Sequence, residues 1–192
     1  MDLLFHDRRD SQLMTATVGP LPARVIWLMG PTSSGKTTLA EYFVQQWRAQ
    51  GRVVIHYDGD EIRNLFGSSH GFAEKDRLQV VRTLTKLANK AAAAGVLCVV
   101  SALTAHPDAR EHVRSAISSL LLGYIRCSID ECARRDPKGL YAQAKKGEIN
   151  TLIGWNKRYE PPENPDIILD TETFQPHQLF ARIDTLVHGS EL

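Results

Sequence analysis

The feature that most constrains this chain is an eight-residue run, Gly30-Pro31-Thr32-Ser33-Ser34-Gly35-Lys36-Thr37. It has the spacing Gly-x4-Gly-Lys-Thr, in which glycine lets the backbone curl so that successive N–H groups face a phosphate. The five residues before it, Val25–Met29, are all apolar and predict a strand buried on both faces. Residues 37–50 carry apolar side chains at helical spacing and stop before Gly51. Strand, loop and helix in this order predict a nucleotide-phosphate site.

Each part of this run has a separate electrostatic task. Lys36 is expected to reach the β- and γ-phosphates, and Thr37 to place its hydroxyl on Mg²⁺. The following helix directs the positive end of its dipole at the anion. The residues predicted to bind ATP are Gly30, Ser33, Ser34, Gly35, Lys36, Thr37 and Thr38. The run alone does not separate kinases from GTPases and ATPases.

The rest of the chain alternates apolar strands with amphipathic helices. Further strands are predicted at 52–57, 96–100, 121–129 and 167–169, and helices at 73–94, 107–118 and 176–187. This alternation predicts an α/β protein with the three-layer P-loop NTPase fold, built around a five-stranded parallel sheet. Residues 136–165 are charged, rich in Gly and Pro and poor in apolar runs, which is typical of a mobile lid over a site.

Bulk properties limit the domain organisation and the partners. A length of 192 residues with 43% hydrophobic content suits one well-filled core, so we expect an N-terminal arm at 1–23 and a single domain at 24–192. Lysine and arginine number 23 against 22 acidic residues, which argues against binding to nucleic acid or to an anionic membrane. No stretch reaches the roughly 18 apolar residues that span a bilayer. The three cysteines show no metal-ligand spacing, and we expect a cytoplasmic protein with reduced thiols.

Two carboxylates follow the second predicted strand, at Asp58 and Asp60. In an open α/β sheet, ligands lie beyond the carboxyl ends of the strands, so both side chains should face the crevice that holds the phosphates. A carboxylate there could orient an acceptor hydroxyl, accept its proton or hold Mg²⁺. The same residues would also suit an ordinary Asp-Gly turn with a helix cap.

Several motifs together resemble the adenylylsulfate kinase family, from about Val25 to the C-terminus. They are Asp58-Gly59-Asp60 with Arg63, Gly71-Phe72, Asp76-Arg77, Arg135-Asp136-Pro137-Lys138-Gly139-Leu140-Tyr141, Gly147-Glu148-Ile149, Tyr159-Glu160 and Pro162-Glu163-Asn164-Pro165. The resemblance implies ATP-dependent phosphorylation of the ribose 3′-hydroxyl of adenosine 5′-phosphosulfate, with ATP and Mg²⁺ as cofactors. It also implies a homodimer that acts on a small-molecule nucleotide acceptor.

The resemblance further implies a role for particular positions. Asp58 would be the catalytic carboxylate and a metal-site residue with Thr37, and Lys36 and Lys138 would be catalytic, with Lys138 closing the lid over the transferring phosphate. Arg135 would lie near the ATP. The implied acceptor-site residues are Asp60, Arg63, Phe72, Arg77 and Leu152. Guanidinium groups suit phosphate and sulfate oxygens, and an aromatic face suits a base, which supports Arg63, Arg77 and Phe72 in these roles.

The departures from the family pattern lie on the acceptor side. Val80 stands where the family commonly has asparagine, and Leu152 replaces the second aromatic residue that stacks on the base. Two interpretations as a kinase stay open: an adenylylsulfate kinase with a variant pocket, or a kinase of another nucleotide-linked acceptor such as cytidine diphosphoramidate. A third interpretation is a non-catalytic nucleotide-binding partner module. Sequence position also places His106 and Trp155 near the acceptor, without a physical argument for their roles.

Overall fold

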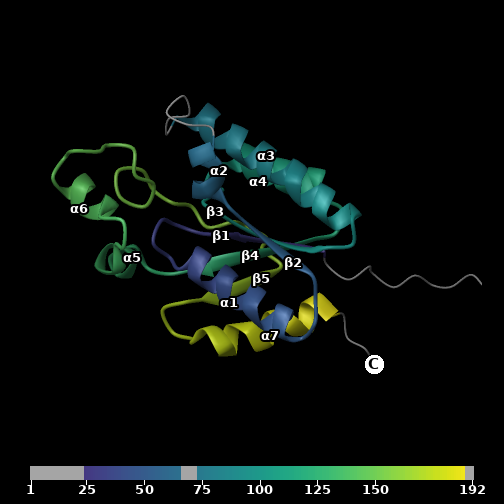
Figure 1. The fold of residues 1–192 in the computed structure, drawn as a ribbon. Helices are drawn as coiled ribbons and strands as arrows, with labels where there is room; N and C mark the ends of the chain where they lie inside the picture. The colour runs from purple at the N-terminus through teal and green to yellow at the C-terminus, as the bar shows by residue number, and fades with distance from the viewer. Residues whose placement is uncertain (1–23, 66–72, 189–192) are drawn as a thin grey trace, which may run out of the picture.

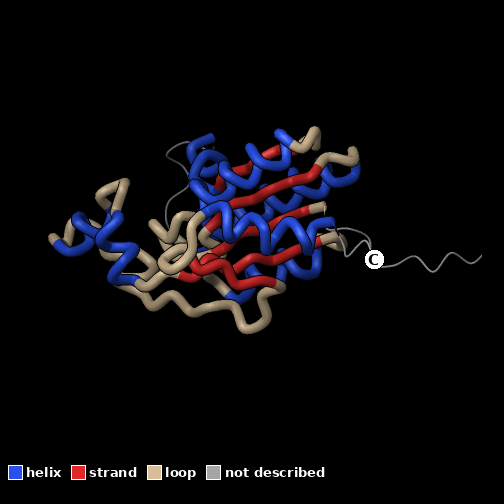
Figure 2. The backbone as a smooth tube through the Cα atoms, turned by 90° about the horizontal axis from the view of Figure 1, so that it is seen from below, coloured by secondary structure: helices blue, strands red, loops and turns tan. Residues whose placement is uncertain are grey.

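The computed structural model describes residues 24–65 and 73–188 (Figure 1). Five parallel strands form one sheet in the order β2-β3-β1-β4-β5, which confirms the predicted α/β fold (Figure 2). The strands are β1 Val25–Met29, β2 Val54–Asp58, β3 Leu97–Ala102, β4 Leu120–Arg126 and β5 Ile167–Asp170. The helices are α1 Lys36–Ala49, α2 Gly59–Leu65, α3 Glu74–Ala93, α4 Pro107–Ala116, α5 Ile129–Arg135, α6 Leu140–Lys145 and α7 Pro176–His188.

The sheet is the middle of three layers, because β1 is completely buried on both faces. Ile26 and Leu28 pack into a core with α1 and α7, whereas Trp27 packs on the opposite face in a core with α3 and α4. Figure 1 shows these two pairs of helices on opposite sides of the sheet. The alternation follows from the two-residue period of a strand, so an uninterrupted apolar run serves both faces.

A third, smaller core lies beyond the carboxyl end of the sheet, around α5 and α6, at the left of Figures 1 and 2. Its buried members are Cys127, Cys132, Tyr141, Ala144 and Leu152. All three cysteines are buried and free. This core gives part of the 136–165 segment a packed structure of its own. That the segment moves as a lid stays a prediction.

The structure corrects the predicted end of the fourth strand. The strand was predicted to continue to Ile129, but β4 ends at Arg126 and α5 begins at Ile129. The Ser128 hydroxyl accepts a hydrogen bond from the Glu131 backbone N–H, which caps the helix and ends the extended conformation. Helices α2, α5 and α6 were not predicted, since each has seven residues or fewer and little apolar periodicity.

The described part of the chain contains no helix with the length and apolar content needed to cross a membrane. The predicted N-terminal arm at 1–23 lies outside the described residues.

Candidate nucleotide and acceptor site

A cavity of about 1280 Å³ lies at the carboxyl ends of the strands, between the glycine-rich loop, α2, α3 and the 136–165 segment. Its volume exceeds the range of roughly 300–1,000 Å³ that is usual for one small ligand, so it has room for two. The predicted site residues that line it are Ser33, Gly35, Lys36, Thr37, Thr38, Asp58, Asp60, Arg63, Arg77, Arg135, Lys138 and Leu152. Phe72, which was predicted to stack on the acceptor base, lies outside the described residues.

Gly30 and Ser34 belong to the loop but do not line the cavity. A Cβ atom added to Gly30 would lie 2.7 Å from the carbonyl oxygen of Ile125, so only glycine allows the loop to pack this closely against β4. The Ser34 side chain is fully buried, and its Oγ has no hydrogen-bond partner among the described residues. Gly30 and Ser34 therefore shape the loop and do not line the cavity.

The loop curls as the sequence predicts. Ser33 has φ 62° and Gly35 has φ 89°, both in the left-handed region that turns the backbone sharply. At the end of this curl, Nζ of Lys36 donates a hydrogen bond of 2.7 Å to the carbonyl oxygen of Pro31. Burial lowers the pKa of Lys36 to about 8. The negative charges of Asp60 and Asp58 offset only part of this effect, so an anion in the loop would stabilise the buried cation further.

Asp58 accepts hydrogen bonds on both carboxylate oxygens. Thr37 Oγ1 and Ser101 Oγ donate to Oδ2 at 2.7 and 2.6 Å, and the backbone N–H groups of Asp60 and Glu61 donate to Oδ1 at 2.8 and 3.4 Å. Burial alone would raise the pKa of Asp58, but these hydrogen bonds outweigh it and hold the pKa below its ordinary value. Asp58 therefore caps α2 and also contacts Thr37 of the nucleotide loop, so the turn-and-cap interpretation is confirmed, and a role with acceptor or Mg²⁺ stays a prediction.

The residues present fit a magnesium ion bound together with a nucleotide. Thr37 and Asp58 provide a hydroxyl and a carboxylate oxygen in contact with each other. The described residues contain no group of three or more His, Cys, Asp or Glu side chains that could hold a metal without help. Mg²⁺ in kinase sites is bound by one or two side chains together with phosphate oxygens, so this sparse donor set suits it.

On the acceptor side, Asp60 joins two cations. Its Oδ1 lies 2.9 Å from Nη1 of Arg63, and its Oδ2 lies 2.6 Å from Nζ of Lys138. Arg77 Nη2 donates to the carbonyl oxygen of Thr151 at 3.3 Å. Burial lowers the pKa of Arg77, and the nearby positive charge of Arg63 lowers it further. Two guanidinium groups that repel each other across a cavity form a favourable place for an anion.

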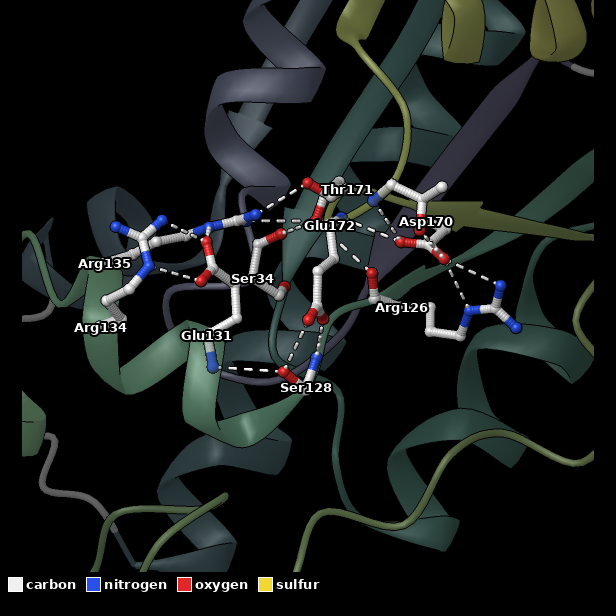
Figure 3. A network of polar contacts seen from close by, with 10 residues as sticks. Ser34, Arg126, Ser128, Glu131, Arg134, Arg135, Asp170, Thr171 and Glu172 are labelled. Carbon is white, nitrogen blue, oxygen red and sulfur yellow. Dashed lines mark hydrogen bonds and ion pairs between the residues drawn. The ribbon is translucent and has the colours of Figure 1, made fainter.

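Arg135 also lines the cavity, beside the glycine-rich loop (Figure 3). Its Nε donates to Glu131 at 2.8 Å and its Nη2 donates to the carbonyl oxygen of Thr171 at 2.8 Å. Thr171 Oγ1 in turn donates to the carbonyl oxygen of Ser34 at 2.7 Å. Hydrogen bonds from Arg134 and Arg135 lower the pKa of Glu131 to about 2. The network fixes α5 and the start of the loop after β5 against the nucleotide loop.

Sequence reasoning missed several residues of this site. Thr104 lines the cavity with φ 40°, an unusual conformation for a β-branched residue. Trp27 Nε1 donates to Thr104 Oγ1 at 2.9 Å, and Arg110 donates to the carbonyl oxygens of Thr104 and Glu160. These contacts tie the loop after β3 to the end of the 136–165 segment. No local sequence pattern indicated them.

His106 and Trp155, to which the sequence assigned no role, differ in their position relative to the cavity. His106 lines the cavity, and its Nε2 contacts a carboxylate oxygen of Glu74. Trp155 does not line it. Its ring lies edge-on to Tyr141, with centroids 6.2 Å apart, and its expected position near the acceptor stays a prediction. Leu152 is buried in the third core and also lines the cavity, where it offers an aliphatic rather than an aromatic face.

A parallel sheet with this loop, a buried lysine and a paired hydroxyl and carboxylate defines an ATP-dependent phosphotransferase of the P-loop kinase class. The sequence model described as adenylylsulphate kinase matches residues 22–170, and the chain belongs to the adenylylsulphate kinase family.

Relatives and solved structures agree with this assignment. The chain is 36% identical to a probable adenylyl-sulfate kinase of Archaeoglobus fulgidus, over 77% of this chain and 96% of the relative. It is 35% identical to the adenylyl-sulfate kinase of Staphylococcus epidermidis, over 88% of this chain and 86% of the relative. The fold is similar to the Mycobacterium tuberculosis APS kinase CysC in complex with AMPPNP and APS. That match has a TM-score of 0.82 at 28% identity and covers 88% of this chain and 99% of that one.

Proposed function

We propose that this protein transfers the γ-phosphoryl group of ATP to the ribose 3′-hydroxyl of adenosine 5′-phosphosulfate. The observation that carries the proposal is that one cavity holds a phosphate loop with Lys36 and a separate pair of guanidinium groups, Arg63 and Arg77. Asp58 connects the two parts, because it accepts from Thr37 and also caps the helix that bears Arg63. A kinase needs this arrangement, with one anion site for the donor, another for the acceptor and a carboxylate between them.

On the donor side, Lys36 and the N–H groups of the loop would bind the phosphates, and Arg135 would lie close to the nucleotide. Thr37 and Asp58 would hold Mg²⁺, which neutralises charge on the phosphates when it is bound. The Thr37 hydroxyl donates its hydrogen to Asp58, so the lone pairs of its oxygen stay available to a cation.

On the acceptor side, Arg63 and Arg77 would bind the phosphosulfate, and Val80 and Leu152 would contact the base. Asp58 would orient the 3′-hydroxyl. It already accepts four hydrogen bonds, which stabilise the carboxylate and make it a weak base. We therefore propose that Asp58 orients the 3′-hydroxyl and does not take up its proton. The proton would leave with the transferred phosphate or pass to solvent.

The 136–165 segment is proposed to close over the bound nucleotides. Two hydrogen bonds connect the segment to the acceptor side. Lys138 donates to the Asp60 carboxylate, and the carbonyl oxygen of Thr151 accepts from Arg77. Closure would exclude water and limit hydrolysis of ATP.

The test is ADP release by the purified protein with MgATP and adenosine 5′-phosphosulfate, with the Lys36→Ala variant as control. Saturable release together with a 3′-phosphorylated product by mass spectrometry is expected. A panel of cytidine and uridine diphosphate conjugates is assayed in parallel, because Val80 and Leu152 leave an aliphatic base site that a pyrimidine would also fit. Turnover confined to a cytidine conjugate would overturn the proposed acceptor and make those two residues specificity determinants.

The resemblance to the family also leads us to propose a homodimer in the cytoplasm. Light scattering of the purified protein at micromolar concentration tests the assembly, with a dimer mass of twice 21.5 kDa as the expected result.

A further inference from the structure

A chain of hydrogen bonds leads to Asp58 from Ser101, which also lines the cavity, and from His56, and the proposed reaction does not yet use it. His56 Nε2 lies 2.9 Å from Ser101 Oγ, and Ser101 Oγ lies 2.6 Å from Asp58 Oδ2. Asp58 Oδ2 also accepts from Thr37 at 2.7 Å. A continuous polar path therefore runs from a histidine on the sheet, through a serine on the neighbouring strand, to the carboxylate and the nucleotide loop.

The register of the sheet brings these residues together. Asp58 in β2 pairs with Ser101 in β3, and the two strands are parallel. His56 and Asp58 are two positions apart in β2, so both side chains point to the same face. That face packs against α1, since Val54 belongs to the core that α1 and α7 cover. Ser101 is 2% exposed and Asp58 is 6% exposed, so water does not compete freely for these bonds.

The direction of the hydrogen bonds follows from the number of hydrogens. The Ser101 hydroxyl has one hydrogen, and it is donated to the Asp58 carboxylate, which has none to give. Ser101 Oγ must therefore accept from His56, so Nε2 of the imidazole carries a hydrogen. The charged side chains whose fields act on the imidazole are Asp58, Glu41 and Arg48 of α1, and Glu61 of α2.

We propose that Ser101 is a positioning residue for Asp58, and that His56 holds the Ser101 hydroxyl in the orientation that donates to the carboxylate. Asp58 needs one fixed rotamer because it must meet the nucleotide-bound Mg²⁺ and the acceptor hydroxyl at once. Groups behind a metal ligand commonly contribute about 10- to 100-fold to metal affinity or activity. The role in turnover rests on the proposed function, whereas the role in nucleotide binding does not.

The experiment compares Ser101→Ala, His56→Leu and His56→Gln with the wild type. Glutamine places an amide N–H near the position of Nε2, so His56→Gln tests whether a donor alone is sufficient. Thr85→Val is the matched control, because Thr85 is also a buried hydroxyl, 2% exposed, but it donates to the carbonyl oxygen of Val81 in α3, away from Asp58.

Two quantities are measured for each variant. One is kcat at saturating MgATP and adenosine 5′-phosphosulfate, with both KM values. The other is the ratio of the ATP dissociation constants without and with Mg²⁺, from calorimetry in the absence of acceptor. Ser101→Ala is expected to lower both kcat and this ratio by about tenfold, with the acceptor KM changed by less than about threefold. His56→Leu should move both quantities in the same direction, and His56→Gln and Thr85→Val should stay close to the wild type.

Clear outcomes overturn the proposal. If Ser101→Ala keeps both quantities within about twofold of the wild type, Ser101 does not position Asp58. If His56→Leu matches the wild type, or if His56→Gln is as impaired as His56→Leu, the hydrogen-bond donor role of His56 is wrong. Wild-type protein that binds MgATP but does not turn over adenosine 5′-phosphosulfate would contradict the proposed function alone, since the Mg²⁺-dependent ratio still reports on Ser101 and His56.

Discussion

Nζ of Lys138 lies 2.6 Å from Oδ2 of Asp60, across a separation of 78 residues in the sequence. The other oxygen of the same carboxylate contacts Arg63 in α2. One carboxylate therefore connects the 136–165 segment to the helix that bears an acceptor-side arginine. The Asp60 and Lys138 side chains are both about half exposed, so we expect the contact to orient the two side chains and to add little to the stability of the fold.

The Asp60→Asn variant should separate these two effects. Its free energy of unfolding is expected to change by less than about 1 kcal/mol, because exposed ion pairs contribute little. Its kcat/KM for the acceptor should fall about tenfold or more, since Arg63 and Lys138 lose the charge that holds them in place. Urea denaturation and steady-state kinetics check the two expectations.

A control for Asp60→Asn is Glu148→Gln, which removes a carboxylate 4.0 Å from Lys146 in the same segment but outside the cavity. It should leave both stability and kinetics unchanged. Equal kinetic losses in the two variants would mean that general charge, and not the Asp60 contact, is responsible.

Lys36→Ala should reduce turnover strongly without destabilising the fold. Loss of the cation that faces the phosphates is expected to reduce kcat/KM by roughly 100-fold or more. Burial lowers the pKa of Lys36 to about 8, which shows that the charged form is held at a cost in the absence of an anion. The variant should therefore melt at the same temperature as the wild type or above it, by calorimetry without ATP. A markedly lower melting temperature would contradict this account.

Thr104→Val tests the contact between Trp27 and the loop after β3. Valine keeps the shape of the side chain but leaves the buried indole N–H without its acceptor, so we expect a loss of about 1–3 kcal/mol in the free energy of unfolding. Trp27→Phe removes the donor. In a double-mutant cycle, the combined variant should lose less than the sum of the two single losses. Additive losses would show that the hydrogen bond contributes nothing.

The ion pairs of Glu131 predict a pH-dependent difference in stability. Arg134 and Arg135 lower the pKa of this carboxyl from 4.5 to about 2 in the folded protein. A depressed pKa means that the folded state favours the charged form, so the stabilisation is complete above about 4.5 and is lost as the pH falls toward about 2. Thermal melting should therefore separate the wild type from Glu131→Gln at pH 7, and the difference should shrink through that range. A constant difference would refute the assignment.

Much of the fold could be predicted because its signals are local. The apolar run of β1 and the glycine-rich loop lie within thirteen consecutive residues, Val25–Thr37, and their conformation depends on neighbours in the sequence. The end of β4 was missed although a signal was present. Ser128 followed by Glu131 is a helix-start pattern, but the apolar residues Cys127 and Ile129 on either side of Ser128 masked it.

The sequence alone determined the strand-loop-helix unit and the alternating α/β order, and it predicted the residues that would face phosphate, because each of these depends on spacing over a short stretch of the chain. Only the tertiary structure decided that Ser101 and His56 are linked by hydrogen bonds to Asp58, that Trp27 donates to Thr104, and that Trp155 packs against Tyr141. The contacts with Ser101 and Thr104 join residues 43, 45 and 77 positions apart. Strand register and packing create such contacts, and no short-range pattern in the chain encodes them.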